Sequence, residues 1–151
     1  MQPPPSCLLR RGRCSEPGRV YLLTSTTDQR RPLFHDFHAA RLVIRQFRQA
    51  DQEHHCQTLA WVVMPDHVHW LIMLKEVTLG ALMRRFKSRS SHALRKAGAH
   101  AAPIWQDGYH DRALRREEDV VKAARYIICN PVRAGLVSRV GDYPHWDAVW
   151  V

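Results

Sequence analysis

The segment 64–71 constrains the fold more than any other, because it places two histidines two residues apart at the start of an apolar run. His67 and His69 alternate with Val68 and Trp70, and a period of two is typical of a β-strand. Side chains of a strand alternate between its two faces. We therefore expect both imidazoles on one face, while Val68 and Trp70 anchor the core with the other.

The remaining apolar residues recur with helical or strand periods. Thr78 suits the N-cap of one helix, and Pro131 ends another, because the residue before a proline is disfavoured in the α region. We expect strands over 19–27, 57–64 and 67–75, a short strand or crossing loop over 104–110, and helices over 37–50, 79–98 and 117–130.

This order of elements predicts an α+β fold of the ferredoxin-like, split βαβ type, in which an antiparallel sheet has its helices packed on one face. A chain of 151 residues suits one domain with a sizeable core. We place that domain at 19–151. Residues 1–18 are rich in proline and arginine, and we expect a flexible basic arm there.

Charge and cysteine usage narrow the class of protein. There are 23 Lys and Arg against 14 Asp and Glu, which gives a formal charge of +9 and favours a polyanionic partner over a merely basic soluble protein. The four cysteines form no Cys-x-x-Cys pair and no regular framework, so a zinc ribbon and a disulfide scaffold are not indicated. No apolar run is long enough to span a bilayer, and we expect a cytoplasmic protein that does not contact membranes.

The last helix carries a tyrosine that its apolar face does not need. At 100° per residue the apolar stripe consists of Val120, Ala124, Ile127 and Ile128. Tyr126 lies off this stripe, with Asn130 one turn after it and Lys122 one turn before it. An isolated tyrosine of this kind is usually a surface residue packed on a loop. Here the neighbouring amide and ammonium suit a phenol that must lose its proton near a metal.

The histidine pair supplies two ligands of a divalent metal site. Neutral imidazole binds such ions readily, although strand histidines also often serve only as hydrogen-bonding groups. Asn130 is our candidate for the third ligand, because its carbonyl oxygen is a hard donor suited to Mg²⁺ or Mn²⁺. His110 or His145 would be needed for a site made of histidines alone, which is the less favoured alternative.

One helix is strongly basic on the faces that its apolar positions leave free. We assign phosphate contacts to Arg84, Arg85, Lys87 and Arg89. A solvated helix face is the competing interpretation of any single one of these cations.

Four ordered segments together resemble a known family: 18–34, 61–71, 105–112 and 126–137. They resemble the single-tyrosine HUH transposases, in the branch called REP-associated tyrosine transposases. The segment 61–71 resembles the family's motif of histidine, hydrophobe and histidine, and 126–137 resembles its nucleophile helix with the turn that follows. A lone His-x-His is a weak signal, whereas the ordered set of four is strong.

The resemblance implies that Tyr126 attacks single-stranded DNA and forms a 5′-phosphotyrosine link, with a divalent metal held by His67 and His69. It implies hairpin DNA of the REP type as the substrate, and a bacterial, nucleoid-associated monomer or homodimer. Two alternatives stay open: a noncatalytic module that binds single-stranded nucleic acid, and a metal-dependent hydrolase in which water attacks. A covalent protein–DNA adduct distinguishes the transposase from both.

Overall fold

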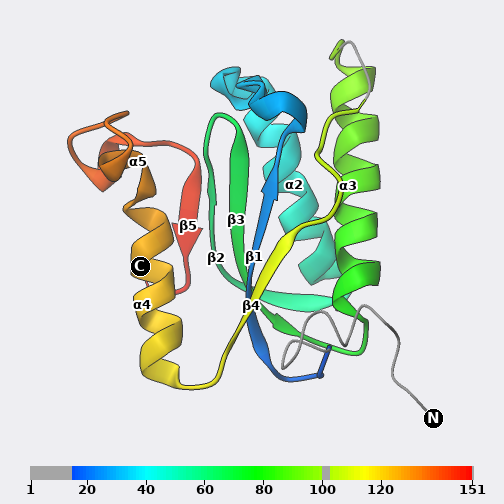
Figure 1. The fold of residues 1–151 in the computed structure, drawn as a ribbon, viewed down its shortest axis with the longest axis vertical. Coiled ribbons are helices and arrows are strands. Elements are labelled where there is room, and N and C mark those ends of the chain that lie inside the picture. The colour runs from blue at the N-terminus through cyan, green and yellow to red at the C-terminus, as the bar shows by residue number, and fades with distance from the viewer. Residues whose placement is uncertain (1–14, 100–102, 151) are drawn as a thin grey trace.

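The computed structural model describes residues 15–99 and 103–150 of the chain. Its strands form one sheet in the order β4-β1-β3-β2-β5, and every neighbouring pair is antiparallel (Figure 1). The strands are β1 (Val20–Thr26), β2 (Cys56–Val63), β3 (His67–Leu74), β4 (His110–Leu114) and β5 (Trp146–Ala148).

Three long helices cover the two faces of this sheet (Figure 1). They are α2 (Phe37–Gln52), α3 (Leu79–Lys96) and α4 (Glu117–Ile128). Helices α2 and α3 pack on one face and α4 packs on the other. A short helix, α5 (Asn130–Arg133), follows α4 directly, and three 3-10 turns lie at η1 (Asp28–Arg30), η2 (Leu33–His35) and η3 (Val140–Asp142).

The larger core lies between the sheet and the pair α2 and α3. Trp70 is 1% exposed, and its ring centroid lies 4.8 Å from that of Phe47 and 5.3 Å from that of Phe86. Its indole N–H donates to the Thr58 hydroxyl at 3.0 Å, so the buried polar atom is satisfied. The side chains of β3 that share a face with Trp70 therefore anchor the larger core, as the sequence predicts.

Side chains at their N-caps fix where the two core helices begin. The Thr78 hydroxyl accepts from the Ala81 backbone N–H at 3.0 Å, which confirms the predicted cap of α3. The Asp36 carboxylate accepts from the His38 N–H at 3.0 Å at the start of α2. Each bond satisfies one of the backbone donors that a helix leaves free in its first turn.

The predicted α+β class and antiparallel sheet are confirmed, but the expectation that all helices share one face is wrong for α4. The strands are apolar on both faces near the middle of the sheet, where Ala60, Val62 and Leu71 point away from the first core. Helix α4 covers these residues with Ala124 and Ile127, and a second core results. A sheet that is apolar on both faces must be covered on both.

The strands at the two edges of the sheet differ from expectation. Trp105 forms only an isolated bridge with Thr27, and the regular strand β4 begins at His110, where the predicted crossing segment ends. The strand β5 was not expected at all. It is only three residues long and pairs with β2 through Ala60, so its periodicity is too short to be recognised in the sequence.

Most of the expected arm over 1–18 lies outside the described residues. Its described part contacts the domain: the Ser15 hydroxyl accepts from the Leu79 backbone N–H at 2.9 Å, and the Gly18 N–H donates to the Leu74 carbonyl at 2.7 Å. In the part of the chain that the structure describes, no helix has the length and apolar character needed to cross a membrane.

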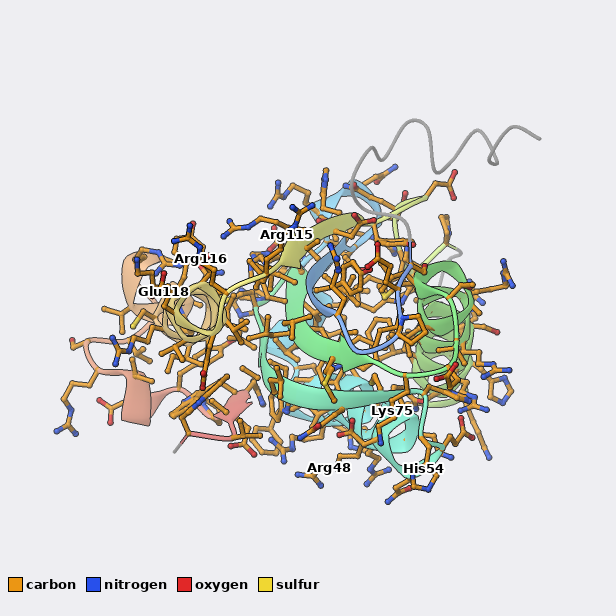
Figure 2. The ribbon with its side chains drawn as sticks, turned by 90° about the horizontal axis from the view of Figure 1, so that it is seen from below. Arg48, His54, Lys75, Arg115, Arg116 and Glu118 are labelled. Atoms are coloured by element: carbon orange, nitrogen blue, oxygen red, sulfur yellow. The ribbon has the colours of Figure 1, made fainter. Side chains whose placement is uncertain are left out.

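The directions of β3 and α4 determine where the candidate metal ligands and the candidate nucleophile lie. Seen from below, Lys75, which follows β3, and Arg116, which precedes α4, lie at the same end of the molecule (Figure 2). The start of β3 and the end of α4 must then both lie toward the other end, as Figure 1 also shows. His67 begins β3 and Tyr126 lies in the last turn of α4, so the fold brings both toward one end of the domain.

Candidate active site

The two histidines lie on the sheet face that α4 covers, with their ring centroids 4.9 Å apart and their planes nearly perpendicular. The Nδ1 atom of His67 is 2.7 Å from the Asp66 carboxylate oxygen Oδ1, and the Nδ1 atom of His69 is 2.8 Å from the Thr24 hydroxyl. These contacts occupy one nitrogen of each ring. Nε2 is then the atom of each ring that serves a further ligand, as in many metal sites.

Asn130 meets the histidine pair from the other end of the sequence. Its side-chain Nδ2 lies 3.4 Å from Nε2 of His67, across 63 residues of chain. A half-turn of the carboxamide exchanges its nitrogen and oxygen, so the carbonyl oxygen can take the same place. Asn130 begins α5, and Pro131 at the next position suits the first turn of a helix. The break between α4 and α5 therefore places this amide against β3.

Tyr126 is 59% exposed, although it lies one turn from the partly buried Asn130. The guanidinium of Arg133 covers its ring, with Cζ 3.8 Å from the ring centroid. The same guanidinium donates from Nη2 to the Tyr126 backbone carbonyl at 2.6 Å. A cation over an aromatic face is attractive. The phenol is therefore held by a neighbour and still accessible to a large substrate.

The electrostatics of the site favour a neutral imidazole at His69. Burial lowers the pKa of His69 to about 4, with further lowering by the neighbouring His67 and Arg133. Burial alone would raise the pKa of the Asp66 carboxyl, but its hydrogen bonds with His67 and Arg30 outweigh burial and hold that pKa below its ordinary value. A neutral ring and an ionised carboxylate are the forms that a histidine metal site with an outer carboxylate requires.

The residues that converge here fit a divalent cation. Two imidazole nitrogens and one amide oxygen form a mixed donor set with room for oxygen ligands from water or substrate. Within 15–99 and 103–150, no group of three or more His, Cys, Asp and Glu could hold a metal ion. A third protein donor at the histidine pair would therefore be of another residue type, and the Asn130 side chain contacts His67 there.

The two alternative histidines lie apart from the pair. His110 of β4 pairs with Thr24 of β1, and Thr24 pairs with His69 of β3. His110 therefore lies two strands away from His69, at a distance of roughly 10 Å. His145 packs against Phe37, with ring centroids 5.1 Å apart. Neither completes the histidine site that would favour zinc.

The basic residues predicted for DNA lie in two different places. Lys122 is exposed on α4, one turn before Tyr126. The four α3 cations assigned to phosphate contacts lie in the layer on the opposite face of the sheet from the histidines. Three of them have partners within the chain: Arg85 contacts His55 at 2.6 Å, Arg89 pairs with Glu53 at 2.7 Å, and Lys87 donates to the carbonyls of Gln106, at 2.8 Å, and Gly108.

The fourth of these assigned cations, Arg84, is exposed. The structure does not bring any of the α3 cations to the tyrosine, so their phosphate contacts remain a prediction. Three residues at the site were missed by the sequence reasoning: Thr24, Asp66 and Arg133. Asp66 directly precedes His67 and could have been noticed. The place of Thr24 depends on strand register, and that of Arg133 depends on the turn after α4.

Comparison with known proteins identifies the family of the chain. Residues 19–128 match the family model described as "Transposase IS200 like". The chain belongs to this family of transposases. It is 32% identical over 87 residues to the "REP-associated tyrosine transposase" of Escherichia coli (strain K12), an alignment that covers 56% of this chain and 50% of that protein. The chain thus spans about half the length of this curated relative.

A solved structure extends the similarity to most of the fold. It is described as "Structure of the REP associates tyrosine transposase bound to a REP hairpin". The match has a TM-score of 0.75 and 25% sequence identity, and it covers 87% of this chain and 77% of that one. The resemblance to REP-associated tyrosine transposases inferred from the four sequence segments is confirmed.

Proposed function

We propose that this chain is a DNA transesterase of the REP-associated tyrosine transposase type, which cleaves and rejoins single-stranded DNA at hairpins. The observation that carries this proposal is the 3.4 Å approach of Asn130 to His67. It brings the helix of the candidate nucleophile, Tyr126, to a pair of histidines far away in sequence. A structural role alone does not explain an exposed tyrosine one helical turn from an amide that contacts His67.

Tyr126 is the proposed nucleophile. Its phenol oxygen forms a bond to the phosphorus, the bond from phosphorus to the 3′-oxygen of the preceding nucleotide breaks, and that oxygen leaves with a proton as a free 3′-hydroxyl. The phenol proton passes to solvent or a nearby base. A phosphotyrosine diester retains the energy of the broken bond, so a second 3′-hydroxyl can reverse the step and join strands. Lys122, one turn away, is the proposed cation that favours the phenolate.

His67, His69 and Asn130 are the proposed ligands of Mg²⁺ or Mn²⁺. Such an ion, when bound, polarises the scissile phosphate and stabilises the negative charge that develops on its oxygens. The protein's part is to hold the donors in place. Asp66 and Thr24 do this through the Nδ1 atoms of the two rings.

The contact between His67 and Asn130 forms within a single chain, which supports a site that needs no second subunit. We therefore propose that a monomer can cleave DNA without a partner's tyrosine. Hairpin DNA is the proposed substrate, by analogy with the hairpin-bound relative. Arg133 supplies positive charge beside the nucleophile, whereas Arg84 on α3 can contact only DNA that extends around the sheet.

The test is a covalent adduct. A labelled single-stranded hairpin is incubated with the protein and Mn²⁺ and then run on a denaturing gel. We expect an adduct with the wild type and none with Tyr126→Phe, which keeps the ring under Arg133 and loses only the hydroxyl. Binding without cleavage by the wild type would support the noncatalytic module. Cleavage by both proteins without an adduct would support a hydrolase that uses water.

A further inference from the structure

The loop after β1 is fastened over the turn that leads into the histidine strand. The Thr27 backbone N–H donates to the Asp66 carbonyl at 2.9 Å, and its hydroxyl lies 3.1 Å from the same oxygen. Further along, the Phe34 N–H donates to the Pro65 carbonyl at 3.0 Å. The backbone around the turn before His67 is therefore fixed by segments far from it in sequence.

Two residues of this loop have an unusual backbone conformation. Gln29 has φ +55° and Arg30 has φ +53°, both in the left-handed region. Residues with a Cβ enter this region at an energetic cost, and two in succession are uncommon. The conformation is held by neighbouring hydrogen bonds, such as that from the Arg30 N–H to the Thr27 carbonyl at 3.0 Å. Strain of this kind persists where the surroundings impose it, and it gathers at functional sites.

The strained segment directs the side chain of Arg30 onto Asp66. Its Nε lies 3.1 Å from Oδ2 of the carboxylate, whose other oxygen, Oδ1, lies 2.7 Å from Nδ1 of His67. The Asp66 side chain is only 25% exposed, whereas that of Arg30 is 65% exposed. One carboxylate therefore joins an arginine of the loop to an imidazole of the candidate metal site.

The charge of Asp66 determines which nitrogen of His67 carries hydrogen. An ionised carboxylate only accepts hydrogen bonds, so Nδ1 of a neutral His67 must carry the hydrogen and Nε2 must carry the lone pair. The Thr24 hydroxyl next to His69 can donate or accept, so it fixes no tautomer. The two rings thus differ: only His67 has its lone pair set by an ionised neighbour.

We propose that Arg30 and Asp66 are positioning residues, which hold His67 in the tautomer that directs its Nε2 lone pair toward Asn130, and that the left-handed backbone at Gln29 and Arg30 serves to place this arginine. The proposal rests on the proposed function where it treats His67 as a metal ligand. The tautomer itself is a property of the metal-free protein. It can therefore be tested separately.

The first experiment measures the tautomers directly. Long-range ¹H–¹⁵N correlation spectra of the metal-free protein at pH 8 distinguish a ring protonated at Nδ1 from one protonated at Nε2. We expect the Nδ1–H form for His67 in the wild type and a substantial shift toward Nε2–H in Asp66→Ala. His69 is the internal control, and its pattern should not change. An unchanged His67 pattern in Asp66→Ala overturns the proposal.

The second experiment measures Mn²⁺ affinity by calorimetry. We expect Asp66→Ala to weaken binding about tenfold, the usual effect of removing a group that orients a histidine ligand. Arg30→Gln should weaken it less, because the carboxylate remains. Arg48→Gln is the matched control for loss of positive charge: Arg48 is exposed on α2 at the end of the molecule seen from below, and its loss should leave the affinity unchanged (Figure 2).

A backbone variant tests the loop. Gln29→Gly keeps Arg30 and removes the side chain that disfavours positive φ. We expect a Tm about 2 °C higher with unchanged Mn²⁺ affinity. A lower Tm would contradict strain at this position.

A further variant separates this inference from the function on which it rests. If His67→Ala binds Mn²⁺ as tightly as the wild type, His67 is not a ligand and the proposed metal site fails, while the spectra of the metal-free protein still decide whether Asp66 sets the tautomer of His67. If His67→Ala loses binding while Asp66→Ala and Arg30→Gln match the wild type, the metal site stands and the positioning role of Arg30 and Asp66 is overturned.

Discussion

Arg133 lies across the ring of Tyr126 and also binds its backbone carbonyl, so one guanidinium contacts the candidate nucleophile twice. Tyr126 lies in the last turn of α4, and Arg133 is the last residue of α5. The contact limits the rotamers of Tyr126 in a side chain that is otherwise exposed. A nucleophile held in the reactive orientation reacts faster than one whose side chain rotates among several rotamers.

We predict that Arg133→Ala slows adduct formation about tenfold in single-turnover assays. The lost stacking and hydrogen bond together are worth about 1–2 kcal/mol, and tenfold corresponds to about 1.4 kcal/mol. Arg133→Lys should recover only part of the rate, because an ammonium lacks the planar guanidinium. Arg139→Ala, which removes an exposed arginine paired with Asp142, is the control. Equal rates for Arg133→Ala and the wild type would show that the contact does not orient the tyrosine.

His67→Ala and His69→Ala should each abolish cleavage while the protein stays folded and still binds hairpin DNA. The imidazoles project from the opposite face of β3 to Val68 and Trp70, which anchor the larger core. Removal of a ring therefore leaves that core intact. Mn²⁺ titration of the three proteins, with circular dichroism to confirm folding, tests the assignment. Equal affinity in all three would exclude these histidines as ligands.

The pKa of His69 predicts a loss of stability in acid. Burial, together with His67 and Arg133, lowers it to about 4, below the ordinary value near 6.5. Between these values the unfolded chain binds a proton that the folded protein does not, so the free energy of unfolding falls as pH falls from 6.5 to 4. The contribution of His69 is on the order of 3 kcal/mol, present above pH 6.5.

Thermal melts from pH 7 to 4 measure this effect, with His69→Gln as the comparison. The variant should lose less stability over this range than the wild type. Burial also lowers the pKa of His145, which adds a dependence of the same sign that both proteins share. Parallel curves for the two proteins would contradict the assignment to His69.

Much of this site could be predicted because its signals are local. The alternation around His67 and His69 and the position of Tyr126 off an apolar stripe need only the geometry of one strand and one helix. The proline after Asn130 marks the end of that helix. The approach of Asn130 to His67 was predicted from chemistry, since a third ligand was required, and the fold places the two together.

The parts that sequence reasoning missed depend on pairing between distant segments. Thr24 meets His69 only because β1 and β3 are neighbours in one register. Helix α4 covers its face of the sheet because the inner strands are apolar on both faces. Local periodicity shows that these residues are apolar, but not which helix packs against them. Arg30 reaches Asp66 because the loop has a left-handed backbone at Gln29 and Arg30. The sequence does not indicate this conformation, since neither residue is a glycine.

Charge reversal of Arg84 tests the predicted phosphate contacts of α3. Arg84 is exposed, whereas Arg85 and Arg89 contact His55 and Glu53 within the chain. We predict that Arg84→Glu weakens binding of all hairpins similarly and lowers the slope of log K against log salt by about one, as for the loss of one phosphate contact. Fluorescence anisotropy at several salt concentrations measures both effects. An unchanged slope would place the DNA on the α4 side of the sheet alone.

Substitutions at Asn130 give the sharpest test of the third ligand. Asn130→Ala should reduce cleavage much more than hairpin binding, because it removes the oxygen donor and leaves the rest of the surface unchanged. Asn130→Asp should retain activity with a shifted preference between Mg²⁺ and Mn²⁺, since a carboxylate keeps the oxygen, adds charge and binds the metal more tightly, while it weakens the metal's pull on the phosphate.

The competing role for Asn130 is that of a helix cap before Pro131. In the structure the N-cap of α5 is Cys129, which makes no side-chain cap bond, and the Asn130 amide is directed at His67 instead. A cap lost to alanine typically costs about 1 kcal/mol. We therefore expect Asn130→Ala to melt close to the wild type and to bind Mn²⁺ more weakly. If it melts several degrees lower yet cleaves normally in the cold, Asn130 is a structural residue and the third ligand lies elsewhere.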